Sequence, residues 1–254
     1  MKAKSISSAS PRVRAVLARR GSPKGHVNCK REPYTAIQVP QFKHTGALIA
    51  YASPDSTYAV TMERLGAAKK SICIGIYDFT ANYIRDALIG AMERGVVVEL
   101  MLDLSGAKEQ ILFDSLTELG AATLRAPSCG NPTAKYFPVV HQKVIVIDGQ
   151  WVLVQSGNYS DNSIPVNDPA ADWPKFKTGN RDAGIAVESK KIAAFFAKRL
   201  AADRKLVIDA KLAPKAIAAL KAMPQDGALF LAKPKKAPAT KFKPETFAAK
   251  NMVV

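Results

Sequence analysis

Almost continuous apolar runs alternate with amphipathic segments through the middle of the chain. The runs Ser71–Tyr77 and Val96–Leu102 have the composition of strands that are buried on both faces of a sheet. Ala81–Arg94 and Ala107–Leu119 repeat apolar residues at helical spacing, and a glycine follows each of them. This alternation predicts an α/β fold, with a mixed sheet flanked by helices on both faces.

The pattern continues on both sides of this region. An apolar run at Ala47–Ala52 precedes helical spacing at Thr57–Lys70, and a short strand is expected at Ala121–Arg125. Asp182–Val187 has the pattern of a last strand, and Ser189–Lys205 has that of a helix with one apolar face.

A hairpin is predicted between these elements. Strands are expected at Phe137–Ile147 and Gln150–Gln155, joined at Asp148-Gly149, a dipeptide typical of two-residue hairpin loops. A turn centred there sets residue 141 opposite 156, 143 opposite 154, and 139 opposite 158. Because cross-strand partners share a face, four polar residues are expected to converge on one face of the hairpin. They are His141, Lys143, Ser156 and Asn158, and the other face is expected to carry Val144, Val146, Trp151 and Leu153.

This polar patch suits attack on a phosphodiester. A neutral imidazole is a nucleophile or base near pH 7. A lysine ammonium and an asparagine amide donate hydrogen bonds to phosphate oxygens. The set can therefore attack phosphorus and stabilise the charge that develops. A histidine satisfied within a sheet beside a lysine is the alternative, which explains a lone histidine better than four converging polar residues.

The residues of the hairpin carry a family resemblance. His141-Gln-Lys143, four residues, Asp148, six residues and then Gln155-Ser156-Gly157-Asn158 resembles the H-x-K-x4-D-x6-G-S-x-N signature of the phospholipase D superfamily. Gln155 stands where that family usually has glycine. The resemblance extends over about residues 46–205 and implies the phospholipase D-like α-β-α sandwich.

The resemblance implies a catalytic role for each polar residue of the patch. His141 would attack phosphorus and form a phosphohistidine. Lys143 and Asn158 would hold the phosphoryl oxygens, with Ser156 supporting them at the rim. The expected activity is a metal-independent phosphodiesterase, with no metal and no cofactor implied.

Two acidic residues complete the expected site. Asp148 belongs to the signature and is counted with the catalytic set, although strand parity places it outside the catalytic face and favours a structural role. Asp182 would orient the histidine, at a position where the family more often has glutamate.

The mechanism needs two histidines, a nucleophile and a general acid for the leaving oxygen, but the chain has one copy of the motif. His26 lies in a basic segment, and no H-x-K pattern begins at His44. Either a homodimer or a second phospholipase D-like lobe would supply the second histidine. Phe242-Lys243 faintly echoes Phe42-Lys43, so the chain is alternatively the amino-terminal half of a two-motif enzyme.

The net charge of +16 is confined to the two ends of the chain. Residues 1–43, expected to be a flexible basic arm, carry ten Lys and Arg against one acid, while residues 44–210, the catalytic domain, sum to zero. Residues 211–254, a basic Ala/Lys/Pro-rich tail or inter-lobe linker, carry nine against two. Such ends are expected to bind phosphates without sequence specificity, on nucleic acid or on an anionic membrane, which allows peripheral membrane contact. The core has no amphipathic helix with a clear lipid-facing stripe, which favours nucleic acid over phospholipid.

Composition excludes several other classes of protein. No apolar stretch approaches the roughly 18 to 20 residues of a membrane-spanning helix, so an integral membrane protein is excluded. The three cysteines are scattered, so neither a disulfide scaffold nor a structural zinc site is expected. The basic start lacks the apolar core of a secretory signal, which favours the cytoplasm. The functional alternative is a non-catalytic phosphate- or nucleic-acid-binding module, or an inactive isolated half.

Overall fold

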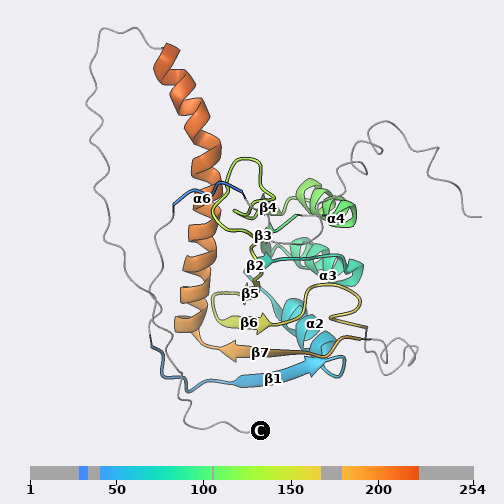
Figure 1. Cartoon of the computed structure of the whole chain (residues 1–254). Helices are drawn as coiled ribbons and strands as arrows, with labels where there is room; N and C mark the ends of the chain where they lie inside the picture. The colour runs from blue at the N-terminus through green and yellow to red at the C-terminus, as the bar shows by residue number, and fades with distance from the viewer. Residues whose placement is uncertain (1–28, 34–40, 105, 167–178, 223–254) are drawn as a thin grey trace, which may run out of the picture.

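The computed structural model describes residues 29–33, 41–104, 106–166 and 179–222. Its centre is a seven-stranded sheet in the order β1-β7-β6-β5-β2-β3-β4 (Figure 1). The parallel part consists of β2 (Ser71–Ile76), β3 (Val97–Leu102) and β4 (Ala122–Arg125). The antiparallel part consists of β1 (Leu48–Ser53), β5 (Lys143–Ile147), β6 (Trp151–Gln155) and β7 (Asp182–Glu188).

Helices cover both faces of this sheet, which confirms the predicted fold class (Figure 1). One face packs against α2 (Thr57–Ala67), α3 (Asn82–Glu93) and α4 (Ala107–Glu118). The other face packs against the long helix α6 (Lys190–Ala222), through Ala193 and Leu200. Each predicted buried strand therefore meets apolar side chains on both sides, as its continuous apolar sequence requires.

Two boundaries differ from those expected. α6 does not end at Lys205 but continues to Ala222, so the first twelve residues of the predicted tail are helical. At the other end, residues 29–33 of the predicted arm lie against the domain, where Cys29 is disulfide-bonded to Cys129. No disulfide scaffold was expected, and the structure has this one disulfide among the described residues. The separation of 100 residues between its cysteines hides the pairing from local sequence patterns.

No helix of the described residues has the length and apolar character that crossing a membrane requires.

Candidate active site

The strands bring several chain segments together at one edge of the sheet. β2, β3 and β6 end at this edge, and β5 and β7 begin there. The residues placed there are Tyr77 after β2, Asp103 after β3, His141 before β5, Ser156 to Asn158 after β6, and Asp182 at the start of β7.

His141 and Lys143 contact each other at this edge. Lys143 is only 4% exposed, and its ammonium nitrogen lies 2.9 Å from each ring nitrogen of the exposed His141. An ammonium has donors and no acceptor, so it can donate a hydrogen bond only to a ring nitrogen that carries a lone pair. The pair therefore places a hydrogen-bond donor beside a side chain that can act as a nucleophile.

Tyr77, which was not among the predicted site residues, contacts both members of this pair. Its ring centroid lies 4.5 Å from that of His141, and the Lys143 ammonium lies 5.4 Å from it, within the range of a cation–π contact. Tyr77 is the last residue of a predicted apolar strand. Its position at the strand end was the one feature of the sequence that could have indicated a place in the site.

Gln142, between His141 and Lys143 in the chain, points its side chain to the other face of the sheet. Its side chain accepts a hydrogen bond from Arg199 of α6, on the opposite face of the sheet. Gly75 leaves the space for it, since a Cβ there would lie 2.6 Å from the Gln142 amide nitrogen. His141 and Lys143 therefore contact each other, while the residue between them points to the opposite face, as the predicted alternation requires.

The hairpin register differs by one residue from the prediction. Ile147 pairs with Trp151 and Val144 with Val154, so the loop has three residues rather than two. Asp148 and Gly149 do form a turn with positive φ values of 54° and 63°, but Gln150 is an additional loop residue. The backbone carbonyl of Gln150 accepts the N–H of Ser189 at 2.8 Å, and its side-chain amide donates to the Glu188 carboxylate at 2.5 Å. These two bonds hold Gln150 outside the pairing of β5 with β6.

The shifted register changes which residues share a face. Val144 and Val146 lie with Val152 against α6, whereas Trp151 and Leu153 belong to the opposite face. The predicted strand is also shorter at its start, because β5 begins only at Lys143.

Ser156 and Asn158 reach the edge by a different route from strand alternation. The chain leaves the ladder after Gln155, and Tyr159 then bonds to the segment after β2, donating its N–H to Asp78 and accepting that of Thr80. This places Asn158 beside the segment that carries Tyr77. Its side-chain oxygen Oδ1 is buried and has no hydrogen-bond partner within the described residues.

Asp182 accepts a hydrogen bond from Ser156, the other polar residue at this end of the strands. The Ser156 hydroxyl donates to Asp182 Oδ1 at 2.9 Å and accepts the N–H of Ala183 at 3.1 Å. Gly157 makes the approach possible, since a Cβ there would lie 2.7 Å from the carboxylate. The second oxygen, Oδ2, is buried without a partner in the described part of the chain, so it can accept a further hydrogen bond.

Gln155, the departure from the family signature, is built into the sheet beside the site. It is 9% exposed, accepts a hydrogen bond from the Tyr51 hydroxyl at 3.1 Å and donates to the Gly157 carbonyl at 3.0 Å. Gly184 pairs with both Gln155 and Tyr51, and a Cβ on it would lie 2.3 Å from the tyrosine ring. The absence of a side chain at Gly184 therefore leaves room for the Tyr51 ring on the neighbouring strand.

Asp148 lies at the other end of β5, so it does not join the catalytic group with which it was counted. Its carboxylate accepts the backbone N–H groups of Lys69, Lys70 and Ser71 at 2.9, 2.7 and 2.9 Å. Partial burial alone would raise the pKa of Asp148, but the three backbone hydrogen bonds and the Lys70 charge outweigh it and lower the pKa. Asp148 is a structural residue that ties the hairpin turn to the start of β2.

His44 does not reach this edge of the sheet. His44 precedes β1, whose opposite end pairs Ser53 with Asp182, and its Nε2 lies 3.3 Å from the Ala47 carbonyl. His26 lies outside the described residues. Among the described residues, no group of three or more His, Cys, Asp or Glu side chains is placed to hold a metal ion.

Comparison with known proteins places this chain in a family. The family model described as "Cardiolipin synthase, PLD-like domain" matches residues 61–204. A phospholipase D of Rickettsia typhi is 30% identical over 122 residues, which cover 48% of this chain and 56% of that protein. A phospholipase D of Rickettsia felis is 26% identical over 147 residues, or 55% of this chain and 70% of that protein.

A solved structure has the same fold. Nuc of Salmonella typhimurium, a phospholipase D family member, superposes with a TM-score of 0.52 at 22% identity, covering 64% of this chain and 96% of that one. The chain matches little more than half the length of the Rickettsia typhi relative. With the family model matched over more than half of its residues, the chain belongs to the phospholipase D superfamily.

Proposed function

We propose that this protein is a phosphodiesterase that works without a metal ion and forms a covalent phosphohistidine at His141. One observation carries the proposal: an exposed imidazole has both ring nitrogens 2.9 Å from the ammonium of Lys143, which is 4% exposed. Beside the exposed His141, the ammonium can also donate a hydrogen bond to a non-bridging oxygen of a phosphate that the imidazole attacks.

The proposed reaction has two displacements at phosphorus. In the first, a ring nitrogen of His141 forms a P–N bond as the P–O bond to the leaving group breaks, and a general acid protonates the leaving oxygen. In the second, the group that protonated the leaving oxygen takes a proton from the water that attacks phosphorus, the P–N bond breaks and the imidazole is restored. Lys143 and the Asn158 amide donate hydrogen bonds to the non-bridging oxygens, where negative charge accumulates.

The general acid comes from a second histidine outside this copy of the motif. His44 is at the far end of β1, and only one H-x-K sequence is present. We propose that a second copy of the chain, or a second lobe of the same family, faces this edge and supplies it. Asp182 Oδ2, buried and without a partner among the described residues, is an acceptor that can orient a histidine N–H there.

Nucleic acid is the proposed substrate class. Phospholipids present the same phosphodiester, and the Rickettsia relatives are named for them. The chain itself carries a net charge of +16 that lies wholly in residues 1–43 and 211–254. Charge placed outside the catalytic domain attracts an extended polyanion, because many phosphates can be contacted at once.

Turnover of bis(p-nitrophenyl) phosphate in excess EDTA tests the reaction, measured per chain over a range of protein concentrations. Activity is expected to survive chelation, to disappear in His141→Ala and to rise with concentration if two copies form the site. A labelled oligonucleotide is expected to be cleaved faster than phospholipid vesicles. Absence of turnover at every concentration would refute the dimeric enzyme, and equal activity in His141→Ala would refute the phosphohistidine.

A further inference from the structure

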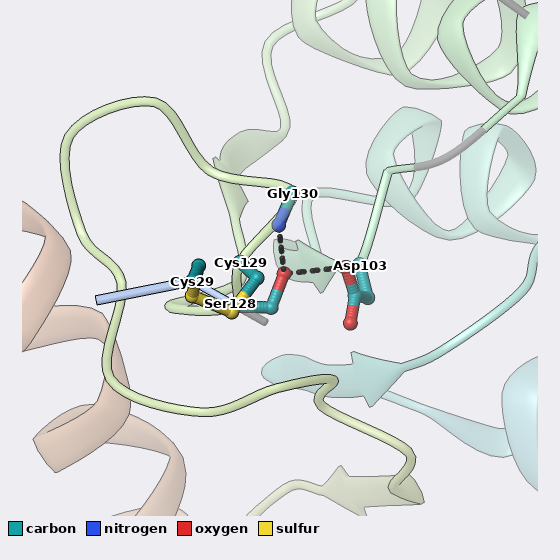
Figure 2. The surroundings of a disulfide bond; sticks show 5 residues. All are labelled: Cys29, Asp103, Ser128, Cys129 and Gly130. Carbon is teal, nitrogen blue, oxygen red and sulfur yellow. Dashed lines mark hydrogen bonds between the residues drawn. A yellow bond between two sulfur atoms is a disulfide. The ribbon is translucent and has the colours of Figure 1, made fainter. Parts of the chain in front are cut away.

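A buried carboxylate holds both ends of the loop that leads to His141. Asp103 follows β3 and is 5% exposed. Its Oδ1 accepts the hydroxyl of Ser128 at 2.7 Å, and its Oδ2 accepts the backbone N–H of Val140 at 2.6 Å. Figure 2 shows the first of these bonds, together with the Gly130 N–H that donates to the same hydroxyl at 3.2 Å.

We propose that Asp103 is a positioning residue for His141. Val140, the neighbour of His141 in the chain, is itself buried. β5 begins only at Lys143, so the carboxylate takes the place of a strand partner for the Val140 amide. Fixing that amide holds the backbone one residue before the Cα from which the His141 side chain extends.

The outer side of the same loop is fixed independently. Cys129 donates its N–H to the Phe137 carbonyl at 2.9 Å, and its sulfur is bonded to Cys29 (Figure 2). The Glu32 N–H donates to the Lys135 carbonyl at 2.7 Å. The loop is therefore held on the outside by residues 29–33 and on the inside by Asp103, which makes the inner anchor the one next to His141.

A carboxylate suits this position better than a neutral side chain. Its two oxygens accept hydrogen bonds from two donors that face it from different parts of the loop, and hydrogen bonds to an ionised acceptor are short and strong. A buried charge requires such donors. The two short bonds of Asp103 thus tie Ser128 to Val140 through one carboxylate.

The inference rests on the proposed phosphodiesterase function, because it assigns Asp103 a part in the same reaction. Asp103 acts through Val140, so a change at Asp103 is expected to displace the nucleophile without removing a group that binds phosphate. Misplacement of a reacting group lowers the rate of the chemical step. The expected signature is a loss in kcat with little change in KM.

Four variants separate positioning from general stability. Asp103→Ala removes both bonds. Asp103→Asn keeps both, because its oxygen accepts the Val140 N–H and its amide donates to the Ser128 hydroxyl. Ser128→Ala keeps the Val140 bond alone. Asp148→Ala removes a carboxylate that also accepts backbone N–H groups, but at the opposite end of β5, and serves as the matched control.

Each variant is measured with bis(p-nitrophenyl) phosphate in EDTA for kcat and KM, by thermal unfolding, and by hydrogen exchange of a peptide containing Val140. Asp103→Ala is expected to lose about 10- to 100-fold in kcat, and its Val140 amide to exchange faster. Asp103→Asn and Ser128→Ala are expected to stay within about threefold of wild type. Asp148→Ala is expected to unfold at a lower temperature with kcat unchanged.

Two results would overturn the inference: unchanged kcat in a folded Asp103→Ala protein, or unchanged exchange at Val140. If Asp103→Ala does not fold, Asp103→Glu, which keeps the charge and moves the oxygens by one methylene group, must show the same loss in kcat, and wild-type kcat there overturns the inference. A wild-type protein with no turnover would refute the proposed function and with it the catalytic role of Asp103, while the exchange measurement would still report whether Asp103 holds Val140.

Discussion

The hydrogen bond between Tyr51 and Gln155 can be tested by a double-mutant cycle. The variants are Tyr51→Phe, Gln155→Met and the two combined. Tyr51 is 5% exposed, and burial raises its pKa above the ordinary value, so its hydroxyl keeps its proton and remains a donor. Gln155→Met keeps the length of the side chain and removes both of its polar atoms.

The expected free energies follow from the groups that each variant leaves buried without a partner. An orphaned buried donor or acceptor costs about 1 to 3 kcal/mol. Tyr51→Phe orphans the Gln155 oxygen, for about 1 to 2 kcal/mol. Gln155→Met orphans the Tyr51 hydroxyl and the Gly157 carbonyl, for about 2 to 4 kcal/mol. The double variant orphans only the Gly157 carbonyl, so its cost should fall short of the sum of the two single variants by about 2 to 4 kcal/mol.

Urea unfolding followed by circular dichroism gives the free energy of unfolding of all four proteins. Equal slopes against urea are required before the values are compared. A coupling free energy below about 0.5 kcal/mol, the ordinary error of additivity, would show that the two side chains are independent and would refute the role of Gln155 as the hydrogen-bond partner of Tyr51.

Three further changes have defined outcomes. Asp148→Ala should lower the free energy of unfolding by about 1 kcal/mol at pH 7, a modest value because the carboxylate is partly exposed. The pKa of Asp148 is lowered in the folded protein, so this stability is present above the ordinary Asp pKa and disappears as pH falls through the folded pKa. The free energies of unfolding of the wild type and the variant should therefore converge in acid. Gly184→Ala should cost about 1 to 3 kcal/mol, because the new methyl group would overlap the Tyr51 ring, and an unchanged melting temperature would contradict this. Cys129→Ser should lower the free energy of unfolding under oxidising conditions by about 2 to 4 kcal/mol and have no such effect on the reduced protein.

Local sequence patterns were enough to predict the helices and strands. They were not enough to predict the hairpin register, which depends on contacts between residues far apart in the sequence. β2 and β3 were predictable because strands buried on both faces are apolar throughout. The pairing of His141 with Lys143 follows from alternation over three residues. The hairpin register was not predictable, because Gln150 is held out of the ladder by Ser189 and Glu188, which come almost forty residues later.

The positions of the acidic residues show the same limit. Asp182 was expected to orient the histidine, and in the structure it bonds to Ser156, an interaction across two strands that neither strand's pattern contains. Asp148 was visible in the sequence as a turn residue, and its three amide partners lie about eighty residues earlier. The family signature and the resemblance therefore named these acidic residues, whereas their hydrogen-bond partners are visible only in the folded chain.

The bond between Cys29 and Cys129 closes a covalent ring of the chain that contains β1 to β4 and helices α2 to α4. A protease that cuts once between these cysteines opens the ring without releasing a fragment. The two pieces separate on a denaturing gel only after reduction, because the disulfide keeps the piece before the cut attached to the piece that carries β5 and β6. The ring thus makes a single cleavage in this part of the molecule a change of connectivity rather than a loss of mass.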